Sequence, residues 1–388
     1  MFDIETYLNS LPENIEKINV PCKDIDYIPD LTRFKKLKIL KCYGNNLTSL
    51  PPLNENLKEL YCFDNKLTSL HLNKNLKILH CSNNLLTALD LNKNLENLFC
   101  NNNRLTSLHL NKKLQELGCS RNQFTSLQLN ENLERLYCSN NQLTSLQLNK
   151  KLEKLDCNDN QLSSLRLNEN LQELSCSNNQ LTALHLNEKL EILVCQNIQL
   201  TTLHLNEKLK QLHCQNNQLN TLHLNENLYL LHCQNNQLTD LQLNKNLEIL
   251  SCDNNELTNL ELNKNLETLS CNNNKLTYLQ LNEELEKIYC SYNQLTSLHL
   301  NEKLRILEYI CNPIFEIINS YDKQIIIKKL KILNNFRYLY YSLKYKKRFR
   351  DILWIKIREP KIREKYSYAY LVANLHEDTD LDYVLENW

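Results

Sequence analysis

A 19-residue period in the positions of cysteine constrains the fold of this chain more than any other feature of its sequence. Cysteine recurs at this interval thirteen times, from Cys62 to Cys290. Cys42 precedes the series by 20 residues, and Cys311 follows it by 21. A fixed period of this length predicts a solenoid in which each repeat packs against its two neighbours, and 388 residues are enough for a long array.

The repeated unit also carries leucine and asparagine at fixed places. One copy reads Leu95-x-x-Leu98-x-Cys100-x-x-Asn103-x-Leu105-Thr106-x-Leu108-x-Leu110-Asn111. This pattern resembles the leucine-rich-repeat pattern L-x-x-L-x-L-x-x-N-x-L, with cysteine in place of the third leucine. The resemblance extends over about 270 residues, from Leu37 to Asn312, and it implies one short parallel strand per repeat.

The strand of each repeat has a buried side and an outward side. Leu98 and Cys100 are two residues apart, so their side chains point to the same side of a strand, which must face the core. Residues 97, 99 and 101 then point outward. Because parallel strands lie about 4.8 Å apart, the fourteen rungs from Cys42 to Cys290 make a ladder of about 65 Å.

The return half of each repeat, such as Thr106 to Asn111, is too short for a full helix and is expected to run extended or in tight turns. It resembles the short repeats of bacterial effector leucine-rich-repeat proteins, although only Leu50-Pro51-Pro52-Leu53 matches their L-P-x-L-P segment closely. We therefore predict an α/β-type repeat solenoid. It is a curved leucine-rich-repeat ladder of short parallel strands with an extended or turn-rich convex side, plus a C-terminal helical cap.

Asparagine occupies the turn that follows each cysteine. An asparagine side chain both donates and accepts hydrogen bonds, so stacked copies are expected to form a buried polar spine that satisfies the backbone of the turns. Ile198 interrupts this register. We predict a local irregularity there, with an unsatisfied backbone group that costs about 1–3 kcal/mol. A second asparagine series, from Asn73 to Asn301, is interpreted as turn chemistry on the return side.

The cysteine ladder has two interpretations, core packing and redox or metal chemistry. Packing is favoured, because cysteine replaces a core leucine and behaves as a small buried apolar residue. Adjacent rungs place Cβ atoms about 5 Å apart, too far for an unstrained disulfide. No C-x-x-C occurs in the sequence, and the stacked His213 and His232 lack converging ligands. We expect reduced thiols, no metal site and no cofactor.

The outward strand positions are the expected binding surface. Most are small and polar, but aromatic residues gather toward the start of the array. The candidate partner-binding anchors are Tyr43, Tyr61, Phe63, Phe99 and Tyr137. Exposed aromatics on a concave sheet are typical interface anchors. The alternative is that tyrosine and phenylalanine simply suit strand surfaces. The chain carries no G-x-S-x-G, Walker A or G-x-G-x-x-G motif, so no enzymatic activity is predicted.

The two ends differ from the repeats. We predict an N-terminal cap or degenerate repeat at 1–35, about 14 repeats of 19 residues at 36–312, and a helical region at 313–388. Residues 322–366 hold 15 basic and 4 acidic side chains, whereas 367–388 hold 5 acidic and no basic ones. A short final helix is expected at Asp380–Trp388, with its acids near the positive end of the helix dipole.

The basic block has three interpretations. Its patch of cations is interleaved with aromatic residues and comprises Lys344, Lys346, Lys347, Arg348 and Arg350. A solenoid must cover the ends of its core, so a helical cap with a solvated charged face is favoured. The alternatives are nucleic-acid binding through the cations and aromatics and attachment to an anionic membrane surface.

The whole chain resembles the uncharacterised leucine-rich-repeat proteins of giant DNA viruses of the mimivirus type. The resemblance rests on the Asn- and Lys-rich short repeats and on Arg358-Glu359-Pro360-Lys361-Ile362 with the later Asp380 to Trp388. It implies a viral protein that acts in an infected host. No signal peptide or membrane span is visible, so an intracellular location in the host cytoplasm or the virion is expected, rather than secretion.

The expected function is non-catalytic scaffolding, in which a protein partner binds the concave face of the repeats. Nucleic-acid or anionic-surface binding through the C-terminal region is an alternative. A third, suggested by the effector-like repeats, is substrate recognition for a ubiquitin ligase. Effector ligases carry a catalytic cysteine domain after their repeats, and no cysteine follows Cys311, so intrinsic ligase activity is not expected.

Overall fold

The computed structural model describes residues 2–320, 322–353, 355 and 359–361. The chain divides into two compact units, Met1–Ile317 and Ile318–Trp388. The acidic segment 367–388 and the short helix expected at its end lie outside the described residues.

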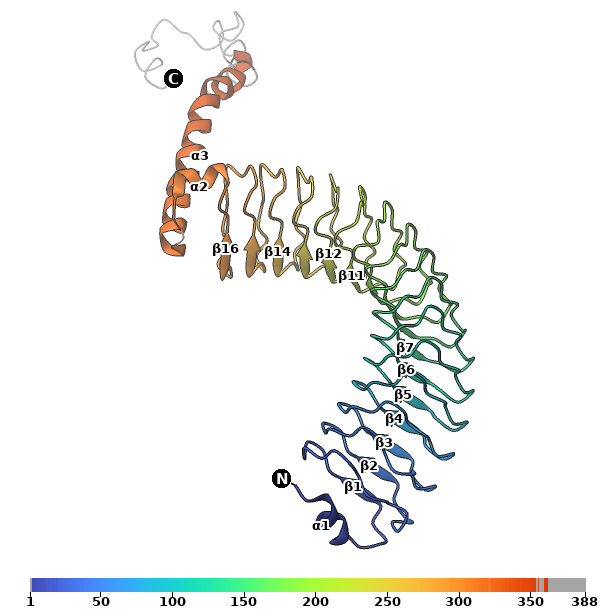
Figure 1. Cartoon of the computed structure of the whole chain (residues 1–388). Helices are drawn as coiled ribbons and strands as arrows, with labels where there is room; N and C mark the ends of the chain where they lie inside the picture. Colours follow the sequence, from blue (N-terminus) through green and yellow to red (C-terminus); the bar gives the residue numbers. More distant parts are fainter. Residues whose placement is uncertain (1, 321, 354, 356–358, 362–388) are drawn as a thin grey trace, which may run out of the picture. The chain divides into compact units, whose positions relative to one another are not determined.

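The first unit is a parallel-strand solenoid, as predicted. Figure 1 shows its strands side by side along the concave side of an arc. Every strand has three residues and pairs in parallel with the strands before and after it in the chain. The strands within the described residues are β1 Lys17–Asn19, β2 Ile39–Lys41, β3 Glu59–Tyr61, β4 Ile78–His80, β5 Asn97–Phe99, β6 Glu116–Gly118, β7 Arg135–Tyr137, β8 Lys154–Asp156, β9 Glu173–Ser175, β10 Ile192–Val194, β11 Gln211–His213, β12 Leu230–His232, β13 Ile249–Ser251, β14 Thr268–Ser270, β15 Lys287–Tyr289 and β16 Ile306–Glu308.

The alternation within each strand places the core as the repeat pattern predicts. In β5, Leu98 is fully buried while Asn97 and Phe99 are half-buried, and Cys100 is fully buried directly after the strand. On the return side, Leu105 and Leu108 close the core of the same rung. Fully burying one such side chain contributes about 1.5–3 kcal/mol, so each rung adds a similar increment to a core that runs the length of the ladder.

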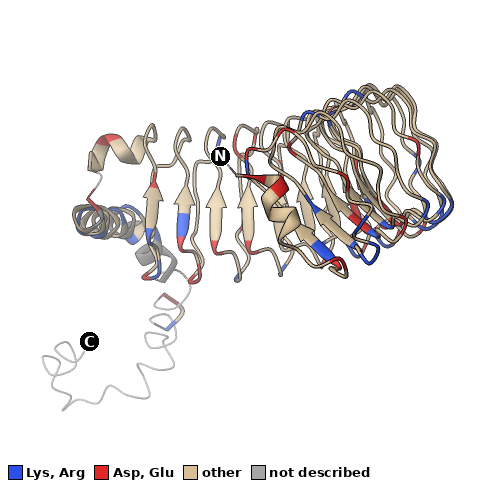
Figure 2. Ribbon diagram, turned by 60° about the horizontal axis from the view of Figure 1, so that its bottom comes forward, with Lys and Arg blue, Asp and Glu red and all other residues tan. Residues whose placement is uncertain are grey.

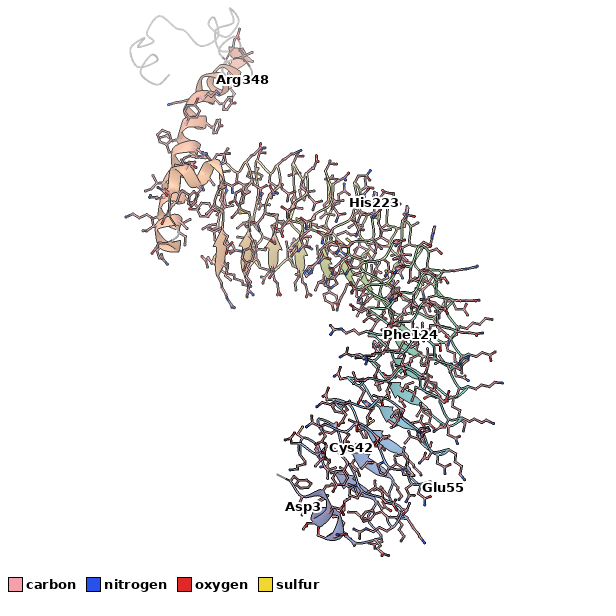
Figure 3. The ribbon with its side chains drawn as sticks, in the orientation of Figure 1. Asp3, Cys42, Glu55, Phe124, His223 and Arg348 are labelled. Carbon is pink, nitrogen blue, oxygen red and sulfur yellow. The ribbon has the colours of Figure 1, made fainter. Side chains whose placement is uncertain are left out.

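The convex side contains no helix anywhere between Lys17 and Asn312, a stretch that the structure describes throughout. Each return segment runs extended and ends in a turn directly before the next strand. Phe124 fills the core position that leucine holds in most rungs, whereas His223 is exposed on the convex side (Figure 3). The extended, turn-rich convex side is therefore confirmed.

The turn after most of the ladder cysteines combines two asparagine positions. The first adopts a left-handed backbone, with φ 52° at Asn102, a conformation that asparagine tolerates better than most residues. The second is the buried spine. The Asn103 side-chain amide donates to the Cys81 carbonyl at 3.0 Å and the Cys100 carbonyl at 3.1 Å, while its oxygen accepts from the Leu86 N–H at 3.0 Å. The spine thus ties adjacent rungs together.

Ile198 disturbs this turn, as the sequence predicts. Isoleucine has no side-chain acceptor, so the hydrogen bond that the Leu181 N–H would make to position 198 is missing. In the preceding rung the equivalent bond joins the Leu162 N–H to the Asn179 oxygen at 3.0 Å. In addition, Gln199 adopts a left-handed backbone with φ 62°, although the equivalent residue Gln180 does not. The irregularity is therefore real, and it involves Leu181 in one rung and Gln199 in the next.

The second asparagine series does more than form turns. The Asn111 oxygen accepts from the Lys113 N–H at 2.7 Å, which is the expected turn. Its amide also donates to the carbonyls of Asn92 at 2.9 Å and Leu95 at 3.0 Å in the preceding rung. Asparagine therefore links neighbouring repeats on the return side as well as at the spine.

The ends of the ladder depart from the cysteine register. Position 309, which lies 19 residues after Cys290, holds the buried Tyr309, while Cys311 is exposed with φ 54° and occupies the left-handed turn position instead. Helix α1, Ile4–Asn9, precedes β1, and the side chain of Asp3 caps it by accepting from the Thr6 N–H at 3.1 Å. Helix α2, Pro313–Ile318, follows β16.

The second unit contains helix α3, Lys323–Leu353. The Asp322 side chain accepts from the N–H groups of Gln324 at 2.8 Å and Ile325 at 3.0 Å, and so it caps the first turn. Among the described helices, none combines the length and apolar character needed to cross a bilayer.

Candidate functional site

A cluster of stacked rings lies on the outward face of β2–β5. We call it the concave aromatic cluster and define it as Tyr43, Tyr61, Phe63, His80 and Phe99. The parallel register aligns these residues in two adjacent rows. Tyr61, His80 and Phe99 are the last residues of β3, β4 and β5, and each pairs with the next across the sheet. Tyr43 and Phe63 follow the cysteines of β2 and β3.

The rings in both rows are in direct contact. Tyr43 and Phe63 stack with ring centroids 4.3 Å apart and planes only 7° from parallel. In the other row, the centroids of Tyr61 and His80 are 4.9 Å apart and those of His80 and Phe99 are 4.4 Å apart. The strand spacing of about 4.8 Å sets these distances, because rings at equivalent positions of adjacent strands must stack.

Gly118 ends the longer row. A Cβ atom at this position would lie 2.8 Å from Phe99 Cδ1, so only glycine leaves room for the phenylalanine ring as it is placed. Tyr137 follows in the next strand and pairs with Gly118 in register. Of the five anchors predicted from the sequence, the structure therefore brings four into one cluster and sets Tyr137 beyond a gap.

His80 is the member of the cluster that sequence reasoning missed. It shares the register of Tyr61 and Phe99, which is the signal in the sequence that could have identified it. Desolvation by the flanking rings lowers the pKa of His80, while Glu116 and Glu59 partly oppose this shift. A neutral imidazole is therefore favoured, and it acts here as a third aromatic ring in the row.

Charged groups fix the start of the cluster. Lys41 Nζ lies 4.7 Å from the centre of the Tyr61 ring, within cation–π range. The Tyr61 hydroxyl donates to Glu59 Oε2 at 3.0 Å, and desolvation together with this carboxylate raises the pKa of Tyr61. The tyrosine therefore remains a neutral hydrogen-bond donor, and both ends of its side chain are held in place.

The cluster is less exposed than the sequence suggested. All five side chains are half-buried, because each ring covers a face of its neighbour. The most exposed large apolar side chains of the first unit lie elsewhere, and they include Tyr27 at 49%, Tyr278 at 48% and Tyr292 at 56%. The rings of the cluster thus form one partly desolvated surface before any partner binds, rather than five separately exposed side chains.

The cysteine ladder offers no reactive group. The fourteen thiols from Cys42 to Cys290 are buried, and all sixteen cysteines of the chain are free. Burial raises the pKa of the Cys100 thiol to about 12 and that of the Cys62 thiol well above its ordinary value. Because the thiolate is the nucleophile and the metal ligand, these side chains are inert at neutral pH. Within the described residues, no group of three or more side chains is placed to hold a metal ion.

His213 and His232 form a second ring contact on the same face. Their centroids are 4.7 Å apart and the rings meet edge to face. Desolvation lowers the pKa of both, and that of His213 is lowered further by His232. The pair lacks neighbouring aromatic rings, so it does not extend into a second cluster.

The predicted basic patch lies on α3. Lys344, Lys346 and Arg348 are exposed, and Figure 3 shows Arg348 on this helix. Lys347 and Arg350 belong to the same helix, but their side chains lie outside the described part of the chain. Lys344 Nζ sits 5.9 Å from the ring centre of Tyr340 and 5.8 Å from that of Tyr345.

Comparisons with known proteins agree with the fold. The family model described as Leucine Rich repeats (2 copies) matches residues 131–169. YopM from Yersinia enterocolitica WA-314 is 27% identical over 77% of each chain, with a TM-score of 0.68. A leucine-rich-repeat protein of Leptospira interrogans is 25% identical, with 84% of this chain and 96% of that one covered and a TM-score of 0.71.

The cysteine repeat also has a counterpart. The functional domain of InlJ from Listeria monocytogenes is described as including a cysteine ladder. It is 28% identical, with 73% of this chain and 69% of that chain covered and a TM-score of 0.59. No curated protein sequence matches this chain. The repeat pattern, the family model and the solved structures lead to one conclusion, which is that the chain has the leucine-rich-repeat fold.

Proposed function

We propose that the chain is a non-catalytic scaffold that binds a protein partner on its concave face. The partner contacts the concave aromatic cluster, with Tyr137 as a separate contact beyond Gly118. The observation that carries this proposal is the pair of adjacent ring rows on β2–β5, in each of which neighbouring ring centroids lie 4.3–4.9 Å apart.

The cluster has the physical character of an interface anchor. Tyrosine, tryptophan and arginine dominate the energy of interfaces, because their large side chains lose much contact with water on binding. The rings here already hold one another in place, so a partner orders few free rotamers when it covers them. Each 100 Å² of apolar surface that the partner buries contributes about 2.5 kcal/mol.

The charges of the solenoid do not favour any one part of its surface as the binding site. Figure 2 shows acidic and basic residues interspersed along the repeats. Many pair between adjacent rungs, as in Lys77–Glu96 at 2.7 Å and Lys210–Glu191 at 2.7 Å. Such exposed pairs add little affinity or stability. The aromatic rows are therefore the feature that distinguishes one part of the concave face from the rest.

The proposal extends to the setting of the protein. The leucine-rich-repeat fold typically presents a surface for protein–protein contact. We propose no catalytic role for this chain. We also propose an intracellular location, because reducing compartments keep thiols such as those of the cysteine ladder free. An origin in a giant DNA virus, suggested by the repeats and the tail, also stays a prediction.

Affinity purification with a matched control tests the proposal. Tagged wild-type chain, Tyr61→Ala plus Phe63→Ala, and Tyr27→Ala plus Tyr278→Ala are recovered from the same cells, and the captured proteins are compared. The control removes two tyrosines that are more exposed but lie outside the cluster. We expect the cluster variant to lose a partner that both other chains retain. Equal recovery of every captured protein by all three chains refutes the proposal.

A further inference from the structure

One face of α3 combines cations and rings that the proposed concave site does not use. Two rows run along the helix at intervals of four residues, Tyr340–Lys344–Arg348 and Arg337–Tyr341–Tyr345. Side chains four apart share a helix face, and the two rows are neighbours around its circumference. We call these six residues the α3 aromatic–basic face.

Within this face, aromatic rings contact one another and also contact a lysine side chain. The Tyr341 and Tyr345 rings are 6.2 Å apart with planes 12° from parallel, and the Tyr340 ring is 5.4 Å from that of Tyr341. Lys344 Nζ lies between the Tyr340 and Tyr345 rings, within 6 Å of both centres. The three tyrosines are 49–52% exposed, so their ring surfaces are open to a ligand.

The positive charge of α3 indicates that its ligand is negatively charged. From Lys323 to Arg350 there are 10 basic residues and no acidic one. Asp351 is the one acidic residue within α3, and it lies beyond the last residue of this face. This arrangement attracts a polyanion.

From this geometry we infer that α3 binds single-stranded nucleic acid. The cations contact successive phosphates, and the tyrosine rings stack on unpaired bases. These are the two elements that sequence-tolerant single-strand binding combines. A duplex keeps its bases stacked on one another, so it can use only the cations.

An anionic membrane fits the same helix less well. A helix that lies in a membrane surface separates one apolar face from one cationic face. In α3, Phe336, Tyr338 and Leu339 are all more than half exposed and project in three different directions around the helix. Cations occur between them, as at the half-buried Arg337 and the exposed Lys346. No single side of this helix is apolar enough to enter a bilayer.

Fluorescence anisotropy of the full chain with a labelled oligothymidylate of about 20 nucleotides tests the inference at about 50–200 mM salt. Alanine at Tyr340, Tyr341 or Tyr345 should weaken binding at least about fivefold per ring. The matching Tyr→Phe variants should retain binding. Serine at Arg337, Lys344 and Arg348 together should lower the slope of log K against log salt by about 2, at about 0.7 for each phosphate contact.

The controls distinguish binding by the α3 aromatic–basic face from non-specific electrostatic binding by the rest of the chain. Tyr278→Ala plus Lys112→Ser removes an exposed tyrosine and an exposed lysine from the solenoid and should leave binding unchanged. Circular dichroism of each variant confirms that the helix is retained. Three results overturn the inference: no binding at the lowest salt, equal affinity for a duplex of the same length, or tight binding to phosphatidylserine vesicles with none to the oligonucleotide.

Discussion

Strands β2–β5 carry Tyr43, Tyr61, Phe63, His80 and Phe99 at their outward positions, whereas β9–β14 carry no phenylalanine or tyrosine there. Beneath both surfaces the core is the same. Leu98 and Cys100 in one region correspond to Leu250 and Cys252 in the other, and all four are fully buried. The inward positions of the repeat thus specify the ladder, which leaves the outward positions free to vary and to define where a partner binds.

The largest expected effect concerns the shared core. Leu98→Ala and Leu250→Ala should each lower the free energy of unfolding by about 2–5 kcal/mol, because each leaves a cavity in a fully buried row. If the two regions share one core, the two losses should be similar. Urea denaturation followed by circular dichroism measures both. A large loss for one variant and almost none for the other would break the equivalence of the regions.

The second expected effect concerns the rung that lacks its asparagine. Ile198→Asn should restore the acceptor for the Leu181 N–H and raise the free energy of unfolding by about 1–3 kcal/mol. Asn103→Ile, the matched reverse change in the aromatic region, should lower it by a similar amount, since it removes the bonds to the Cys81 and Cys100 carbonyls. Thermal melting compares them, and an unchanged or lower melting temperature for Ile198→Asn contradicts the spine account.

The smallest expected effect is a pH dependence. The pKa of His80 is lowered from its ordinary value of 6.5 by desolvation, so the unfolded chain takes up a proton more readily than the folded one. His80 therefore contributes stability that is present above pH 6.5 and is lost as the pH falls below it. His80→Phe keeps a ring in the row, and it should lose less melting temperature between pH 7 and pH 5 than the wild type. An equal loss of melting temperature in both chains would show that groups other than His80 cause the pH dependence.

His213 provides the comparison within the same chain. Desolvation also lowers its pKa, with a further contribution from His232, so His213→Phe should reduce the acid sensitivity in the same direction. The two histidines differ in function, because only His80 belongs to the concave aromatic cluster. His80→Ala should therefore weaken partner recovery, and His213→Ala should leave it unchanged.

The periodicity of the sequence predicted which residues are buried and which form the asparagine spine. It did not predict how the rings stack or how the last turn of the ladder is built. Leu98, Cys100 and Asn103 recur so regularly that their burial and hydrogen bonding follow from strand alternation. The sequence shows Cys311 two residues beyond the 19-residue period, but only the strand register shows that Tyr309 takes the buried ladder position there.

The candidate site shows the same limit. Tyr61 and Phe99 were found from their residue type, but the role of His80 between them depends on rings stacking across three strands. The break at Gly118 depends on the direction in which the Phe99 ring leans, a side-chain torsion that no repeat pattern encodes. Outward positions are not constrained by the core, so their arrangement required the structure.

Site-specific photo-crosslinking compares the two regions most directly. Ser82 and Gln234 both follow a ladder cysteine and are half-buried on the concave face, Ser82 beside the concave aromatic cluster and Gln234 among the small polar positions. A photoreactive residue at each position in turn is irradiated with the partner captured by the wild-type chain. The account predicts a covalent adduct from position 82 and none from position 234. An adduct from position 234 alone would contradict it.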